Sequence, residues 1–149
     1  MKPKRLWSVT LSTVCILIAA LFFCSVISHR HSKDYIFDYV HSNYSELEQL
    51  VESILQSEDQ TPMSFDAWSV RLYKDASMIQ FEGSPRGFGP SCIYTGFYYS
   101  IDGMPKGFDG AKVVYSPDSP GWHWEEDTGD NYAYTEKIIE KWYFFEMRF

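Results

Sequence analysis

Residues 142 to 149, WYFFEMRF, carry the clearest secondary-structure signal of the chain. Its side chains alternate between two faces. One face is fully apolar and carries Tyr143, Phe145, Met147 and Phe149, and the other carries Trp142, Phe144, Glu146 and Arg148. Alternation with a period of two is typical of a β-strand with one buried face. The segment is therefore predicted to be a core strand, and deletion of its last few residues is expected to unfold the domain.

Other segments show the same period. Residues 92 to 101, CIYTGFYYSI, are rich in β-branched and aromatic residues and precede Asp102-Gly103, a turn pair. Residues 68 to 82 alternate on both sides of the turn at 74 to 77, as in a β-hairpin. A short strand is predicted at 113 to 115.

Residues 34 to 56 show the period of a helix instead. Apolar side chains recur at helical spacing at Ile36, Val40, Tyr44, Leu47, Leu50, Val51, Ile54 and Leu55. Ser45 and Glu48 have the spacing of a capping box, so that one helix, or two helices meeting near Asn43, are both open interpretations. The predicted fold class is α+β, with this amphipathic helix packed on an antiparallel sheet of three to five strands. A partner-binding helix is the alternative to core packing.

Residues 6 to 28, LWSVTLSTVCILIAALFFCSVIS, contain no charged residue and follow Lys2, Lys4 and Arg5. With about 1.5 Å of rise per residue, a helix over this run would be roughly 34 Å long, enough to cross a hydrocarbon core of about 30 Å. We favour an uncleaved single-pass anchor that contacts membrane lipid. A cleaved signal peptide, with its cleavage site at 26 to 28, is the alternative.

The charges around this run indicate its orientation. Basic residues collect on the cytoplasmic side of membrane spans, which places residues 1 to 5 in the cytoplasm. Residues 29 to 33 are then a juxtamembrane hinge, and residues 34 to 149 form an extracytoplasmic domain with the carboxyl terminus outside. Three of the 13 basic residues precede the run, whereas all 20 acidic residues follow it. Such an acidic domain repels phosphate backbones, so nucleic acid is not predicted as a partner.

Cysteine usage points to a particular cell envelope. Cys15 and Cys24 lie inside the apolar run, which leaves Cys92 alone in the domain. The exterior domain therefore has no intrachain disulfide, although an oxidising exterior would permit one. We infer a bacterial envelope and a domain stabilised by its core alone.

The signature motifs HExxH, GxSxG, CxxC and the Walker phosphate loop are missing. We therefore predict no catalytic residue, no metal ligand and no cofactor. The one candidate binding segment is residues 122 to 131, WHWEEDTGDN, which combines aromatic rings with carboxylates. Its candidate ligand-binding residues are Trp122, His123, Trp124, Glu125, Asp127 and Asp130.

This segment has four interpretations. Tryptophan rings beside carboxylates suit sugar binding, and paired carboxylates suit glycoside hydrolysis. Carboxylate oxygens also suit calcium, although the spacing does not fit an EF-hand loop. Trp122 and Trp124 are two residues apart, which in a strand places both rings on one face. That spacing favours core packing.

The chain contains three aromatic-rich blocks: Gly96 to Asp102 (GFYYSID), Asp130 to Ile138 (DNYAYTEKI) and Trp142 to Phe149 (WYFFEMRF). These blocks resemble small single-pass anchored proteins of Gram-positive bacteria, which have no assigned function. The resemblance implies a location at the cell envelope and implies no mechanism.

Together these patterns predict a membrane-anchored, non-enzymatic protein that binds a protein partner at the cell envelope. One concrete form is an immunity protein whose acidic surface attracts a basic toxin. Another form is an accessory subunit of a membrane complex. The alternative function is a cell-wall sugar-binding module or hydrolase that uses residues 122 to 131.

Overall fold

A computed structural model of the chain describes residues 14–16, 18, 32–57, 61–88, 91–107, 114–115, 120–125 and 131–149. The predicted cytoplasmic start at 1 to 5 lies outside these residues, as do most of the predicted span at 6 to 28 and of the hinge at 29 to 33. Within the described residues, no helix is long and apolar enough to cross a membrane.

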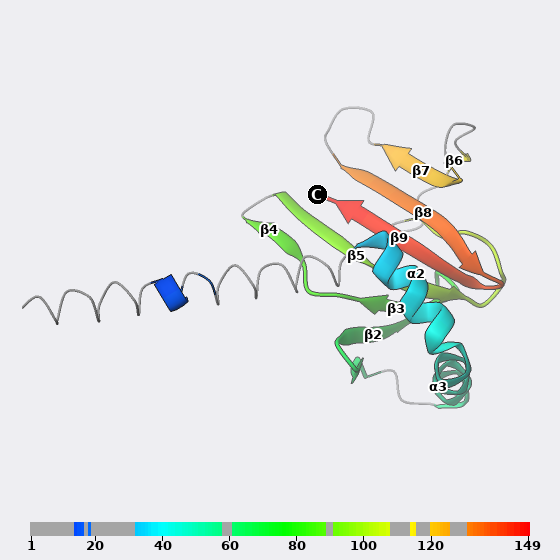
Figure 1. The fold of residues 1–149 in the computed structure, drawn as a ribbon. Helices are drawn as coiled ribbons and strands as arrows, with labels where there is room; N and C mark the ends of the chain where they lie inside the picture. The colour runs from blue at the N-terminus through cyan, green and yellow to red at the C-terminus, as the bar shows by residue number, and fades with distance from the viewer. Residues whose placement is uncertain are drawn as a thin grey trace, which may run out of the picture.

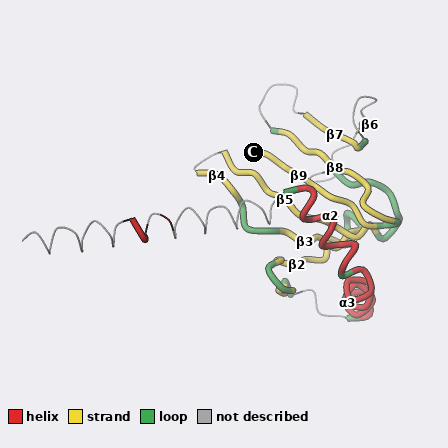
Figure 2. The backbone as a smooth tube through the Cα atoms, in the orientation of Figure 1, coloured by secondary structure: helices red, strands yellow, loops and turns green. Residues whose placement is uncertain are grey.

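The domain begins with two helices and continues as a run of strands (Figures 1 and 2). The elements are α2 (Lys33–Ser42), α3 (Tyr44–Gln56), β1 (Met63–Phe65), β2 (Trp68–Tyr73), β3 (Met78–Glu82), β4 (Arg86–Phe88), β5 (Ser91–Ser100), β6 (Val114–Tyr115), β7 (Gly121–Glu125), β8 (Tyr132–Ile139) and β9 (Trp142–Arg148). This is a mixed α+β fold, as the sequence predicts.

All the strands join one antiparallel sheet. Its order is β1-β2-β3-β5-β9-β8-β7-β6, and β4 pairs with β5 beside β3. The strand predicted most clearly, β9, lies at the centre of the sheet, where it pairs with β5 on one side and β8 on the other. The last residue is also fixed, because Phe149 exchanges backbone hydrogen bonds with Cys92.

The predicted number of three to five strands is wrong, because the described part of the chain forms nine strands of one sheet. Three of the strands, β1, β4 and β7, fall in segments for which the sequence predicts no strand. Each contains five residues or fewer. Such short strands show too little alternation to be recognised, and they form because β2, β5 and β8 present backbone groups that need hydrogen-bond partners.

The predicted helical segment is two helices that meet at Asn43, which confirms one of the two open interpretations. Ser32 caps α2 by accepting a hydrogen bond from the Tyr35 N–H, at 3.2 Å. The predicted capping box is wrong, because Asn43 is the N-cap of α3 and makes no side-chain capping bond. Glu48 instead accepts a hydrogen bond from the indole N–H of Trp142, at 2.7 Å.

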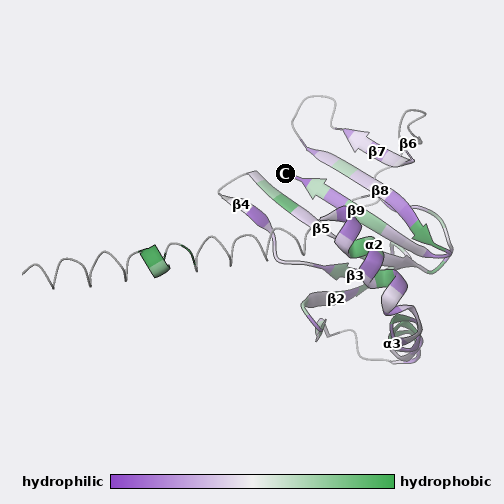
Figure 3. Ribbon diagram, in the orientation of Figure 1, coloured by the Kyte–Doolittle hydropathy of each residue, from purple (hydrophilic) through white to green (hydrophobic). Residues whose placement is uncertain are grey.

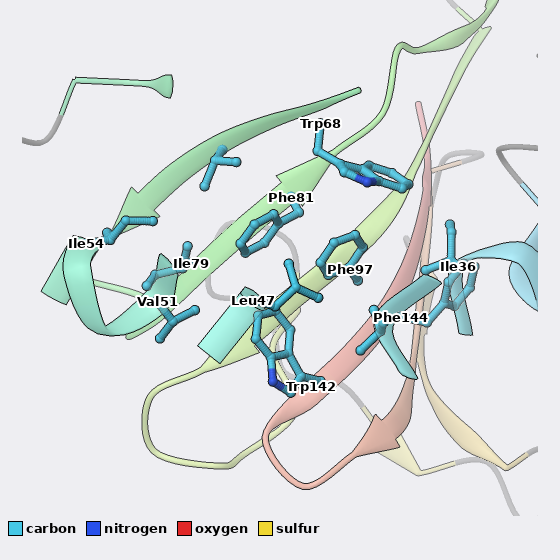
Figure 4. Packing of buried hydrophobic residues seen from close by; sticks show 12 residues of the cluster. Ile36, Leu47, Val51, Ile54, Trp68, Ile79, Phe81, Phe97, Trp142 and Phe144 are labelled. Carbon is cyan, nitrogen blue, oxygen red and sulfur yellow. The ribbon is translucent and has the colours of Figure 1, made fainter. Parts of the chain in front are cut away.

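Both helices pack on one face of the sheet, which we call the helix face (Figure 4). Hydrophobic and hydrophilic residues lie side by side along α2, as expected for a helix with one buried face (Figure 3). The core of this face consists of Ile36, Val40, Leu47, Val51, Ile54, Trp68, Val70, Ile79, Phe81, Phe97, Trp142 and Phe144. At its centre the ring of Phe97 stacks on Phe81, with centroids 4.7 Å apart, and meets Trp68 edge-on at 4.9 Å.

Candidate functional site

The opposite face of the sheet carries a second aromatic cluster, to which neither α2 nor α3 contributes a residue. We call it the groove face. Its buried members are Met78, Tyr98, Ala133, Tyr143, Phe145 and Met147, and Tyr73, Ala76, Tyr94, Trp122, Trp124 and Phe149 pack against them. Strand alternation sends these side chains away from the helix face.

A hollow volume of about 980 Å³ lies along this face, which we call the groove. Its apolar lining includes Met78, Tyr94, Tyr98, Phe145, Met147 and Phe149. Its polar lining includes Lys74, Asp75, Gln80, Glu82, Lys106 and Asn131. Aromatic walls with a few placed polar groups are typical of binding pockets of this size.

Gly96 shapes the middle of the groove face. Glu82, Gly96 and Phe145 lie opposite one another on the adjacent strands β3, β5 and β9. A Cβ atom on Gly96 would lie 2.0 Å from the carbonyl oxygen of Phe81 and 2.9 Å from Cε1 of Phe145. The phenyl ring of Phe145 therefore lies over the glycine backbone, in the space that a side chain would fill.

The loop at 101 to 107 is tied to the groove face by tyrosine hydroxyl groups. The backbone N–H of Lys106 donates to the Tyr98 hydroxyl at 2.8 Å, Tyr98 bonds Thr135 Oγ1 at 2.8 Å, and Thr135 donates to the carbonyl of Phe144 at 2.8 Å. Because Thr135 uses its proton on that carbonyl, Tyr98 is the donor to Thr135. Burial raises the pKa of the Tyr98 phenol, which keeps it protonated as this chain requires.

The same loop is fixed by a second set of bonds. The hydroxyl of Tyr143, whose ring stacks on Tyr98 with centroids 5.2 Å apart, donates to the carbonyl of Gly103 at 2.6 Å. Asp102 accepts from the ammonium of Lys106 at 2.6 Å and from the backbone N–H of Met104 at 3.0 Å. These bonds lower the pKa of the Asp102 carboxyl from 3.8 to about 2, the bond from Lys106 acting most strongly.

Gln80 and Glu82 form a polar pair beside the aromatic lining. The amide of Gln80 donates to Oε2 of Glu82 at 2.7 Å. Burial raises the pKa of the Glu82 carboxyl, while the bond from Gln80 and the charge of Arg71 act in the opposite direction. No Lys, Arg or His nitrogen of the described residues lies within 4.0 Å of this carboxylate. Glu82 is thus a half-buried carboxylate with no ion-pair partner in the described part of the chain.

Four of the six residues predicted as a binding site are described, and they lie on both faces of β7. Trp122 and Trp124 lie on β7, half-buried, and both pack against the groove-face cluster, with the Trp122 ring edge-on to Tyr143 at 6.1 Å. His123 pairs with Tyr134 and alternates to the helix face, and Glu125 is exposed. Asp127 and Asp130 lie outside the described residues. None of the four described residues lines the groove.

The groove residues of β3 and β5 were missed by sequence reasoning. One signal was available, because Gly96 interrupts a strand of otherwise large side chains, and an isolated glycine in a strand indicates close approach of another group. Gln80 and Glu82 offered no signal, since polar side chains alternating with Ile79 and Phe81 are expected to face water.

Among the described residues, no three His, Cys, Asp or Glu side chains come close enough together to hold a metal ion. No protein-family model, curated protein or solved structure matches this chain.

Proposed function

We propose that the chain is a membrane-anchored, non-enzymatic protein that binds a protein partner at the cell envelope through its groove face. The observation that carries the proposal is the groove of about 980 Å³, which is lined by aromatic and methionine side chains and lies on the sheet face without helices. Aromatic residues and Met are enriched in the cores of protein interfaces. An immunity protein and an accessory subunit of a membrane complex are both forms of this function.

The location belongs to the same proposal. Residues 6 to 28 are the anchor, the amino terminus lies in the cytoplasm, and the domain lies outside. Because α2 begins at Lys33, only a few residues separate the domain from the anchor. The domain therefore binds its partner close to the membrane surface. Protease treatment of intact cells tests the orientation, and a domain that resists digestion until the membrane is broken would contradict it.

The binding surface is tested by photo-crosslinking in living cells. A photo-reactive amino acid at Asp75, on the groove rim, is expected to give a discrete protein adduct, whereas the same amino acid at Asp38, exposed on α2, is not. Filling the groove with Ala76→Trp is expected to abolish the Asp75 adduct while the thermal unfolding temperature is retained. Equal adducts from both positions would show that the groove is not the interface.

The alternative function is a sugar-binding module or hydrolase that uses residues 122 to 131. It is tested by measuring whether the same protein binds cell-wall material. Purified cell-wall fragments are expected not to bind the parent protein. Binding that is lost in a folded Asp130→Asn variant would favour the alternative over a protein partner.

A further inference from the structure

The polar end of the groove carries a carboxylate that has no ion-pair partner among the described residues. Of the charged groups that line the groove, Lys106 is held by Asp102 at 2.6 Å, and Lys74 and Asp75 are adjacent residues of opposite charge. The remaining lining charge is Glu82, whose carboxylate accepts a hydrogen bond from Gln80 and is attracted by Arg71, which lies beyond ion-pair distance.

Aromatic rings line the same groove as this carboxylate. The ring of Phe145 extends over Gly96, which lies directly opposite Glu82. Tyr94, two residues before Gly96 on the same face of β5, meets Phe149 edge-on with centroids 5.9 Å apart. A carboxylate beside ring faces suits a cation with an apolar stem, because the charge pairs with the carboxylate while the methylene groups and the ring faces make contact.

The net negative charge of the whole domain also favours a cationic ligand. All 20 acidic residues follow residue 28, but only ten of the 13 basic residues do, so the domain attracts cations over a longer range than the groove itself. Long-range attraction raises the rate of encounter, and a half-buried carboxylate then selects one side chain of the partner.

Building on the proposed function, we propose that the partner inserts a lysine or arginine side chain into the groove, where its charge pairs with Glu82 and its stem lies on Phe145 and Tyr94. The neighbouring residues of the partner are apolar and lie on the methionine side chains Met78 and Met147. The occupant is therefore a basic, partly apolar protein segment, and a neutral glycan lacks the charge that this site selects.

The test uses the full chain in detergent micelles and three blocked decapeptides made of serine and glycine around a central Leu-Lys-Leu, Leu-Gln-Leu or Leu-Glu-Leu. Affinities are measured by isotope-edited NMR titration at low and high salt. The lysine peptide is expected to bind about ten-fold more tightly than the glutamine peptide, and the glutamate peptide is expected to bind least. Added salt is expected to reduce the difference.

Two variants that each remove one negative charge provide the control. Glu82→Gln is expected to erase the preference for lysine, whereas Asp38→Asn, on the exposed surface of α2, is expected to keep it. The resonances of Tyr94 and Phe145 are expected to shift with the lysine peptide in the parent protein. The inference is overturned if lysine and glutamine peptides bind equally, if neither binds, or if both variants lose the preference equally.

Failure of this inference is separable from failure of the proposed function. If the Asp75 crosslink in cells survives Glu82→Gln and the peptides are not distinguished, the groove is the interface but Glu82 does not select a cation. If the Asp75 crosslink is absent from the parent protein, the groove is not the interface. Binding of uncharged wall fragments in competition with the lysine peptide would assign the same groove to a glycan and overturn both.

Discussion

The helix face and the groove face of one sheet hold their aromatic side chains in different ways. On the helix face, Phe81, Phe97 and Trp142 pack against each other and against apolar side chains of α2 and α3, and each exposes less than a hundredth of its surface. On the groove face, Tyr98 and Tyr143 combine stacking with hydroxyl bonds to a loop, and a large hollow volume remains beside them. The first face is closed by the helices, whereas the second retains a hollow volume of about 980 Å³.

The largest loss of stability is expected when one phenylalanine on each face is replaced by alanine. Phe97→Ala is expected to cost about 3–5 kcal/mol of unfolding free energy, because it leaves a closed cavity under the helices. Phe145→Ala is expected to cost less, about 2–3 kcal/mol, because its site borders the groove and solvent or neighbouring side chains can fill the space. Urea denaturation measures both. Equal costs would show that the groove face is as tightly packed as the helix face.

The second prediction concerns the glycine under the Phe145 ring. Gly96→Ala is expected to destabilise the domain by about 1–3 kcal/mol, because the new methyl group meets the carbonyl of Phe81 and displaces the ring. Ser91→Ala, at the exposed start of the same strand, is expected to change stability by less than about 0.5 kcal/mol. A stable Gly96→Ala protein with an unchanged aromatic NMR spectrum would contradict this account of the hollow.

The long elements could largely be predicted from the sequence. A buried face imposes its period on any element long enough to show it, and this period predicts the helical segment, the hairpin and the long strands β5 and β9. The apolar face predicted for β9, which carries Tyr143, Phe145, Met147 and Phe149, lies on the groove face. Strands of three residues, such as β1 and β4, could not be found, because their pairing depends on neighbours that are fixed only in the folded sheet.

The groove could not be predicted, because it depends on which residues of neighbouring strands lie opposite one another. Glu82, Gly96 and Phe145 lie on three different strands and become neighbours only when β3, β5 and β9 pair in one particular alignment. The aromatic spacing in β7 was informative about packing alone, since Trp122 and Trp124 share a face and pack on the cluster there. Residues that share a site across strands leave no pattern along the chain.

The third prediction tests whether tyrosine hydroxyls fix the wall of the groove. Tyr143→Phe removes the bond to the carbonyl of Gly103 and is expected to cost about 1 kcal/mol. Tyr98→Phe removes the acceptor of the Lys106 N–H, whose hydrogen exchange is expected to accelerate. Tyr44→Phe, at the start of α3, loses an exposed bond to Glu140 and is expected to change little. Unchanged exchange at Lys106 in Tyr98→Phe would show that other contacts hold the loop.

The smallest effect is expected at Glu82, and it has the opposite sign. Burial raises the pKa of this carboxyl in the folded protein, so folding favours the protonated form. Between the ordinary pKa of a glutamate and the raised value, the folded state binds more protons than the unfolded state, and stability falls as pH rises through that window. Glu82→Gln removes the titrating carboxyl and therefore this loss of stability. Its side-chain oxygen still accepts a hydrogen bond from the Gln80 amide.

Glu82→Gln is therefore expected to stabilise the domain at neutral pH by less than about 1 kcal/mol, since the half-buried carboxylate is screened by solvent. The gain is expected to shrink as pH falls through the raised pKa, where the parent carboxyl becomes neutral. Thermal unfolding of both proteins across this pH range measures it, with Asp38→Asn as the control for removal of one charge. If Glu82→Gln stabilises the domain and also loses binding, Glu82 serves ligand binding at a cost in stability. If Glu82→Gln destabilises the domain, the carboxylate instead contributes to the structure of the sheet.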